Sequence, residues 1–188
     1  MSGMNDLRVA GLRIRPAEPA DLDAVLDFWR TAAEGTSISD DAAGVARLLS
    51  RDPGALLLAE HQHKHRHTDD GRTDEAHGTH GAGDGVQAAP GRGTDSTEAA
   101  RARLVGSVIA GFDGWRCHLY RLAVHPDHRR RGVAGALLAA AEERFTALGG
   151  RRADAMVLDR NDLAHPAWRA SGYAPQSQWT RWVKPLTG

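Results

Sequence analysis

Hydrophobic residues recur along this chain at two spacings, one typical of helices and the other of strands. Apolar positions three and four residues apart predict helices at 19–33, 40–50 and 161–171, and an Ala- and Leu-rich segment predicts a longer helix at 131–148. Short apolar runs predict strands at 9–15, 55–60, 104–112, 115–124 and 153–158, with further pieces near Tyr173 and at 179–183. Their order predicts a mixed α/β sheet.

The apolar faces of three predicted helices supply the expected core. Their inward residues are Leu22, Val25, Leu26 and Trp29, then Val45, Leu48 and Leu49, then Val133, Leu137, Leu138 and Ala141. Asp113 and Gly114, between two strand-like runs, indicate the tight turn of a hairpin.

Residues 61–103 differ in composition from the rest of the chain. They contain no Ile, Leu, Met, Phe, Tyr or Trp, and Val86 is their only large aliphatic residue. Because such a segment cannot bury enough apolar surface to offset the entropy lost on ordering, we expect a disordered insertion between the second and third strands. The chain, 1–188, is otherwise predicted to form one domain.

The insertion is rich in histidine, which leaves two interpretations open. The residues are His61, His63, His65, His67, His77 and His80. Imidazoles at alternate positions could bind a transition metal, which would make the protein a metal-binding or metal-responsive module. We favour a solvated segment of biased composition, because no supporting second shell is apparent, and the prediction includes no metal.

Charge and cysteine content exclude several classes of function. The 24 Lys and Arg residues equal the 24 Asp and Glu residues, so neither nucleic acid nor a membrane is expected as a partner. The single cysteine, Cys117, allows no intrachain disulfide and is expected to be a strand residue of the hairpin. No signal peptide and no apolar stretch of membrane-spanning length is apparent, so a cytoplasmic location is expected.

The most informative segment joins the end of a predicted strand to the helix at 131–148. The strand ends at His125, because a residue before proline is held extended and proline cannot donate to a ladder. Small residues at Gly132, Ala134 and Gly135 would let a ligand approach the main chain closely. The free N–H groups of the first helical turn would then form an anion site.

This segment resembles the coenzyme A signature of the GCN5-related N-acetyltransferase superfamily, Gln/Arg-x-x-Gly-x-Gly/Ala, matched by Arg129, Gly132 and Ala134. The resemblance implies that main-chain amides of this turn bind the pyrophosphate of acetyl-CoA, at Arg129, Arg130, Arg131, Gly132, Val133, Ala134, Gly135 and Ala136. It also implies that Leu122, Ala123 and Val124 pair with the pantetheine arm. A nucleic-acid patch is the alternative for the three arginines, but no other basic cluster supports it.

A second match follows downstream, where Asn161-x-x-Ala164, Trp168 and Gly172-Tyr173 resemble the later sequence block of the same family. The resemblance implies that Asn161, Ala164 and Trp168 contact the cofactor, although Asn161 also suits a helix cap. The implied fold is a mixed, mostly antiparallel central sheet with helices on both faces.

The resemblance also implies direct attack of an amine on the thioester in a ternary complex. Val124, at the bulged end of the central strand, would supply the main-chain N–H that polarises the carbonyl. The family commonly has a tyrosine near the sulfur, where this chain has Trp168. An indole is not a proton donor near neutral pH, so Tyr173 or water would protonate the thiolate, unless it leaves as the anion.

The sequence indicates the general base, the group that would take a proton from the amine, less directly than it indicates the cofactor site. The strand at 115–124 lacks the glutamate that often occurs there in the family, and its nearest titratable residues are Asp113, His118 and Tyr120. Alternation places His118 and Tyr120 on one face, so a water relay through them is our hypothesis.

The predicted function is that of an enzyme, an N-acetyltransferase that moves the acetyl group of acetyl-CoA to a primary amine of a small molecule or protein, as a monomer or homodimer. The acceptor would lie among the helices within 16–50, the strand at 115–124 and the C-terminal region. Tryptophans that could line this site, although packing or surface anchoring is favoured for each, are Trp29, Trp115, Trp179 and Trp182. Trp168 and the missing glutamate leave a second hypothesis, a non-catalytic domain that binds or senses acetyl-CoA.

Overall fold

Five strands form a single sheet in the order β1-β2-β3-β4-β5. The computed structural model describes residues 11–33, 35, 37, 39–61 and 104–186. The strands are β1 (Leu12–Pro16), β2 (Leu56–His61), β3 (Leu104–Phe112), β4 (Cys117–Val124) and β5 (Ala153–Ala155). Neighbours from β1 to β4 are antiparallel, and β5 runs parallel to β4. The expected mixed, mostly antiparallel sheet is confirmed.

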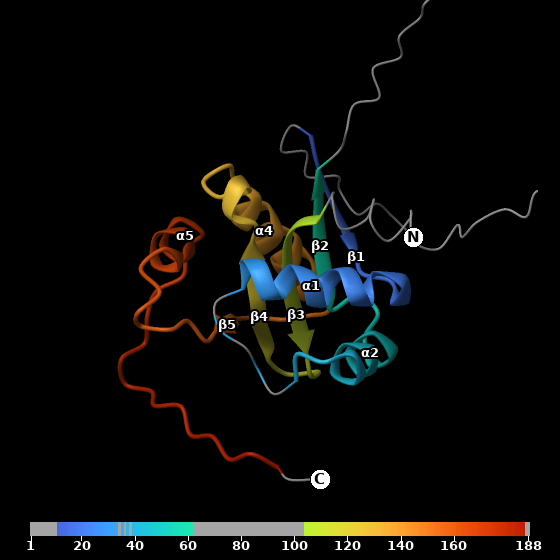
Figure 1. The fold of residues 1–188 in the computed structure, drawn as a ribbon. Helices are drawn as coiled ribbons and strands as arrows, with labels where there is room; N and C mark the ends of the chain where they lie inside the picture. The colour runs from blue at the N-terminus through green and yellow to red at the C-terminus, as the bar shows by residue number, and fades with distance from the viewer. Residues whose placement is uncertain (1–10, 34, 36, 38, 62–103, 187–188) are drawn as a thin grey trace, which may run out of the picture.

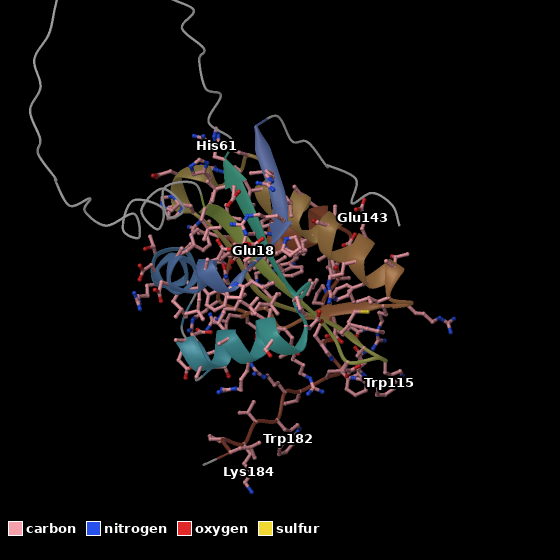
Figure 2. The ribbon with its side chains drawn as sticks, turned by 90° about the vertical axis from the view of Figure 1, so that its right-hand side faces the viewer. Glu18, His61, Trp115, Glu143, Trp182 and Lys184 are labelled. Carbon is pink, nitrogen blue, oxygen red and sulfur yellow. The ribbon has the colours of Figure 1, made fainter. Side chains whose placement is uncertain are left out.

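Helices cover both faces of the sheet (Figure 1 and Figure 2). A short 3-10 helix, η1 (Pro19–Asp21), leads into α1 (Leu22–Ala32), which lies on one face together with α2 (Ala42–Arg51). The opposite face is covered by α4 (Val133–Ala147), with α5 (Ala164–Ala170) at its side. None of the helices within the described ranges is both long and apolar enough to cross a membrane.

Each face of the sheet has its own cluster of buried apolar side chains. Alternate residues of β2 divide between the faces, with Leu57 on the α4 side and Leu56 and Leu58 on the side of α1 and α2. The buried residues of α4 are Val133, Ala136, Leu137, Leu138, Ala141 and Phe145. The buried apolar residues of α1 and α2 are Ala24, Val25, Phe28, Trp29, Ala32, Val45 and Leu49, while Leu22, Leu26 and Leu48 are only partly buried.

The C-terminal region differs from the sequence prediction. Residues 171–186 contain no strand, so the strands predicted near Tyr173 and at 179–183 are wrong, and β5 ends before the predicted boundary at 158. A strand requires a partner that supplies its hydrogen bonds, and an apolar run alone does not provide one. Trp182, which is 92% exposed, lies on a tail that extends away from the sheet (Figure 2).

The boundary of the predicted insertion moves by one residue. His61 pairs with Leu12 and belongs to β2, so the range predicted at 61–103 begins inside a strand. The remainder, 62–103, lies outside the described residues, as do the first residues of the strand predicted at 9–15.

Candidate active site

A turn joins β4 to α4 and holds two residues in the left-handed region. After Val124, a 3-10 helix, η2 (Pro126–His128), redirects the chain. Arg130 then has a φ of +58° and Gly132 a φ of +81°. Because Gly132 adopts this conformation without steric cost and caps the helix, α4 begins at Val133, two residues after the predicted start.

The first turn of α4 offers main-chain N–H groups to a ligand. The N–H of Ala136 donates to the carbonyl of Gly132 at 3.0 Å, which is the first hydrogen bond of the helix. The N–H groups of Val133, Ala134 and Gly135 precede it and have no carbonyl acceptor within the helix. A Cβ atom added at Gly132 or Gly135 would meet no heavy atom within 4 Å, so the approach is open. This geometry, with the positive end of the helix dipole behind the donors, suits an anion.

Basic side chains lie in this turn and beside it. Arg130 and Arg131 are exposed. The ring of His128 lies 5.7 Å from that of His61, at the end of β2, and 5.9 Å from that of His125. Burial lowers the pKa of His128, and the charge of Arg131 and the two neighbouring imidazoles lower it further. A bound anion would offset the charge of Arg130 and Arg131 and favour the protonated form of His128.

The main-chain groups of Val124 point away from β3. The N–H of His125 donates to the carbonyl of Val105 at 2.9 Å, and Val124 lies opposite Gly106. Since hydrogen-bonded and non-hydrogen-bonded pairs alternate along an antiparallel ladder, the N–H and C=O of Val124 face the other side. The carbonyl there accepts a hydrogen bond from Nε of Arg129 at 3.2 Å. The N–H of Val124 therefore lies on the edge of β4 that faces β5.

β4 continues beyond its partner strand. The pairs between β4 and β5 run only from Cys117–Ala153 to Leu119–Ala155. The stretch from Tyr120 to Val124 thus has one edge without a partner strand among the described elements. An extended ligand can pair with such an edge as an added strand.

A bulge interrupts β4 within this stretch. The register shifts so that one residue of β3, Val108, lies opposite two residues of β4, Arg121 and Leu122. Arg121 has a φ of +50°. The bulge therefore lies at Arg121 and Leu122, shortly before Val124, where the family resemblance implied the bulged end of the strand.

His118 and Tyr120 share one face of β4, as alternation predicts, and their ring centroids are 5.9 Å apart. Nδ1 of His118 lies 2.5 Å from Oδ1 of Asp154, its neighbour in the parallel ladder. Burial raises the pKa of Tyr120, and the charges of Asp154 and Asp113 raise it further, so its hydroxyl stays protonated at neutral pH. The arrangement presents a histidine oriented by a carboxylate beside a protonated phenol.

The residues of the second sequence block lie around α5. Oδ1 of Asn161 accepts a hydrogen bond from the N–H of Ala164 at 3.1 Å. The helix predicted from 161 begins at Ala164, and its N-cap position is Leu163, so Asn161 lies before the cap. Trp168 is buried and packs edge-on against Tyr173, with ring centroids 5.0 Å apart. The hydroxyl of Tyr173 donates to Glu142 at 3.0 Å, and burial together with this hydrogen bond raises the pKa of Tyr173. Tyr173 is therefore a weaker acid than an ordinary tyrosine.

Of the tryptophans considered for the acceptor side, one is buried and three are exposed. Trp29 is buried and donates from Nε1 to the hydroxyl of Ser107 at 2.9 Å. Trp115, Trp179 and Trp182 are exposed on the surface. Cys117 is a strand residue at the start of β4, as predicted, and its side chain is buried.

Sequence reasoning missed three charged residues at this site. Asp154 could have been found as an acidic residue within an otherwise apolar predicted strand. Asp40 and Arg121, which form an ion pair, are distant in sequence, and no local pattern connects them. Across the part of the chain that the structure describes, no group of three or more His, Cys, Asp or Glu side chains is placed to hold a metal ion.

The chain resembles known acetyltransferases over most of its length. The sequence model of the Acetyltransferase (GNAT) family matches residues 17–173. An acetyltransferase of Sodalis glossinidius is 44% identical over 165 residues, which cover 88% of this chain and 89% of that protein.

Solved structures show the same fold. Ard1 from Thermoplasma volcanium has a TM-score of 0.59 at 15% identity, covering 89% of this chain and 86% of that one. AAC(6')-Iy in complex with the bisubstrate analogue CoA-S-monomethyl-acetylneamine has a TM-score of 0.56 at 17% identity, covering 93% and 99%. By its family match and its sequence relative, the chain belongs to the acetyltransferase (GNAT) family of enzymes.

Proposed function

We propose that the protein transfers the acetyl group of acetyl-CoA to a primary amine of a small molecule or a protein, in a ternary complex. The observation that carries this proposal is the turn before α4, where Val133, Ala134 and Gly135 present N–H groups without helical acceptors. A pyrophosphate supplies both the acceptors and the negative charge that such a turn favours. The CoA-derived analogue bound to AAC(6')-Iy supports this class of ligand.

Acetyl-CoA would extend from this turn along the unpaired edge of β4. Residues 129–136 would bind the pyrophosphate, and Leu122, Ala123 and Val124 would pair with the pantetheine arm. The outward N–H of Val124 would donate to the thioester carbonyl, on which negative charge develops during attack. The residues assigned to the opposite side of the arm are Asn161, Ala164 and Trp168.

The acceptor amine must lose a proton to attack the thioester. We assign His118 as the proton acceptor at the end of a water relay, because Asp154 engages its Nδ1 and leaves Nε2 as the basic nitrogen. Tyr120, which stays protonated, would hold the water or the amine. The new N–C bond forms as the C–S bond breaks, and the electron pair of that bond leaves on the sulfur as a thiolate.

The leaving thiolate requires no tyrosine in this arrangement. Trp168 would pack beside the sulfur without donating a proton, and Tyr173 is held by Glu142. A thiolate whose thiol has a pKa of about 8.5 is an adequate leaving group, and water can protonate it afterwards.

A panel of primary amines incubated with the protein and acetyl-CoA, with products measured by mass spectrometry, tests the proposal. We expect an acetylated product for at least one class of amine, with free CoA released in equal amount. Binding of acetyl-CoA without a product from any amine would support the alternative, a non-catalytic domain, to which Trp168 and the lack of a glutamate on β4 point. Absence of binding would overturn both.

The histidine-rich segment requires a separate test. Glu60 of β2 pairs with Leu104 of β3, so a short turn can replace residues 62–103. We expect the shortened protein to bind acetyl-CoA and transfer acetyl groups as the full chain does, because the proposed site lies on the sheet and α4. Retained binding and activity would leave the segment dispensable, and loss of both in a folded protein would show that the proposed activity requires it.

A further inference from the structure

A salt bridge ties the bulge in β4 to the segment between α1 and α2. The guanidinium of Arg121 donates twice to Asp40, from Nε to Oδ1 at 2.9 Å and from Nη2 to Oδ2. Its Nη1 donates to the carbonyl of Gly35 at 3.0 Å. The side chains of Arg121 and Asp40 are only 13% and 15% exposed, so this pair is largely shielded from water. Two residues distant from β4 in sequence therefore anchor the bulge.

The main chain of Arg121 is held as well. The hydroxyl of Ser107, which is fully buried and accepts a hydrogen bond from Trp29 at 2.9 Å, lies 3.4 Å from the carbonyl oxygen of Arg121. The guanidinium carbon of Arg121 lies 5.8 Å from the centre of the Trp29 ring. Both the side chain and the carbonyl of this residue are thus fixed, from α1, from β3 and from the segment before α2.

The position of Arg121 determines which way the end of β4 faces. Leu119 and Leu122 both pack on the α4 side, so the two residues between them break the strand's simple alternation. A residue other than glycine in the left-handed region costs about 1 kcal/mol, and the φ of +50° at Arg121 therefore needs support from its contacts. Loss of those contacts would let β4 return to a regular register and redirect the N–H groups after the bulge.

We propose that Arg121, clamped by Asp40 and Gly35, is a positioning residue that aims the N–H of Val124 at the thioester carbonyl of acetyl-CoA. This inference rests on the proposed function, because it assumes that acetyl-CoA lies along the unpaired edge of β4.

Infrared spectroscopy of bound acetyl-CoA, labelled with carbon-13 at the thioester carbonyl, reports whether the carbonyl accepts a hydrogen bond from the protein. Hydrogen-bond donation lowers the infrared stretching frequency of a carbonyl, and we expect such a shift when the wild type binds the label. Arg121→Lys keeps the charge but not the two-pronged donor, and Asp40→Asn removes the charge of the acceptor. Each is expected to bind acetyl-CoA more weakly, because the N–H groups that pair with the pantetheine arm move as well. At saturating acetyl-CoA each is expected to lose at least half of the shift and to lower kcat about tenfold or more.

Asp52→Asn is the matched control. Asp52 pairs with Arg144, whose Nη1 donates to the carbonyl of Ala110 at 3.0 Å, so the same kind of bridge is broken away from the bulge. The carbonyl shift of labelled acetyl-CoA bound to Asp52→Asn should equal the shift measured with the wild type. Arg121→Gly accepts a positive φ without strain but lacks the side chain that pairs with Asp40. It should also lose the carbonyl shift. It replaces Arg121→Lys in the test if that variant folds poorly.

A full carbonyl shift in folded Arg121 and Asp40 variants would overturn the positioning role while leaving the proposed function intact. A wild type that binds acetyl-CoA without any shift would instead remove the role of Val124, and the positioning role with it. Failure of the wild type to bind the label would remove the proposed function itself. The three outcomes can be told apart. The first is seen in the infrared spectra of the variants, the second in the infrared spectrum of the wild type, and the third in the binding measurement on the wild type.

Discussion

At the scale of single residues, the proposed proton transfer would depend on the contact between His118 and Asp154. The carboxylate fixes one ring nitrogen at 2.5 Å and so determines which nitrogen can accept a proton. His118→Ala is expected to lower kcat/KM about 100-fold with unchanged affinity for acetyl-CoA, and Asp154→Asn about tenfold. Steady-state kinetics over a range of pH measure kcat/KM, and calorimetry measures the affinity for acetyl-CoA.

Added imidazole provides the control for the histidine variant. If His118 accepts the proton, imidazole should restore part of the activity of His118→Ala and none of that of Tyr120→Phe, which should itself lower kcat/KM and shift its pH profile. An equal loss of acetyl-CoA affinity in these variants would place His118 in cofactor binding and contradict the assignment.

His128 gives a second prediction at this scale, on the pH dependence of cofactor binding. Burial and neighbouring positive charges, chiefly Arg131, lower its pKa, and the phosphates of a bound CoA would raise it again. Binding should therefore take up a proton, and affinity for CoA should fall by up to about tenfold as the pH rises from about 5.5 to 7.5. Calorimetry in two buffers of different ionisation enthalpy measures the proton directly. His128→Asn should abolish the uptake, and an unchanged uptake in that variant would contradict the prediction.

At the scale of elements, the start of α4 combines a strained turn with a proposed binding role. Gly132→Ala places a side chain at a φ of +81°, which costs about 1 kcal/mol and displaces the N–H groups that follow. We expect a modest fall in the free energy of unfolding and a rise of about tenfold or more in the Kd for acetyl-CoA, measured by denaturation and calorimetry.

Gly114→Ala is the matched control for this variant. Gly114 has a φ of +92°, and a Cβ atom there also meets no heavy atom within 4 Å. It lies in the β3–β4 turn next to Trp115, at the far end of the sheet from His61 (Figure 2). The same loss of stability with an unchanged Kd is expected. Equal changes of Kd in both variants would show that Gly132 acts through stability alone.

The elements that sequence pattern predicts well are those whose apolar residues are buried locally. β3 begins and ends where predicted, because its run from Leu104 to Phe112 packs on both faces. The start of α4 was predicted two residues early, since apolar spacing does not report the left-handed Gly132. The strand predicted at 179–183 fails because no edge of the sheet pairs with it.

The candidate site also contains residues that the sequence pattern predicts and residues that it does not. The turn before α4 could be predicted, because its residues are contiguous and their small size has a local reason. The partners of His118 and Arg121 could not, because each contact crosses between segments that only the folded sheet brings together: Asp154 lies 36 positions from His118, and Asp40 lies 81 positions from Arg121. Long-range strand register and side-chain pairing leave no periodic signal in one sequence.

At the scale of the whole molecule, acid stability depends on a charged cluster that ties η1 to the first two strands. Arg15 donates to both oxygens of Asp21, at 2.6 and 2.7 Å, and to Glu60 at 2.7 Å. Burial alone would raise the pKa of Asp21, but the hydrogen bonds from Arg15 and from the N–H of Glu18, with the charge of Arg15, hold it below its usual value. The carboxylate form is therefore favoured by folding.

The sign of the pH dependence follows from this lowered pKa. Above the pKa of the unfolded chain, about 3.9, the contribution of Asp21 is fully present, and it is lost as the pH falls toward the lower pKa of the folded state. Asp21→Asn should reduce the free energy of unfolding by about 2 kcal/mol at pH 7 and flatten its decline below about pH 4, measured by urea denaturation. Asp23→Asn, an exposed change two residues away, should stay within about 0.5 kcal/mol of the wild type. Equal acid sensitivity in the wild type and Asp21→Asn would show that another group governs unfolding by acid.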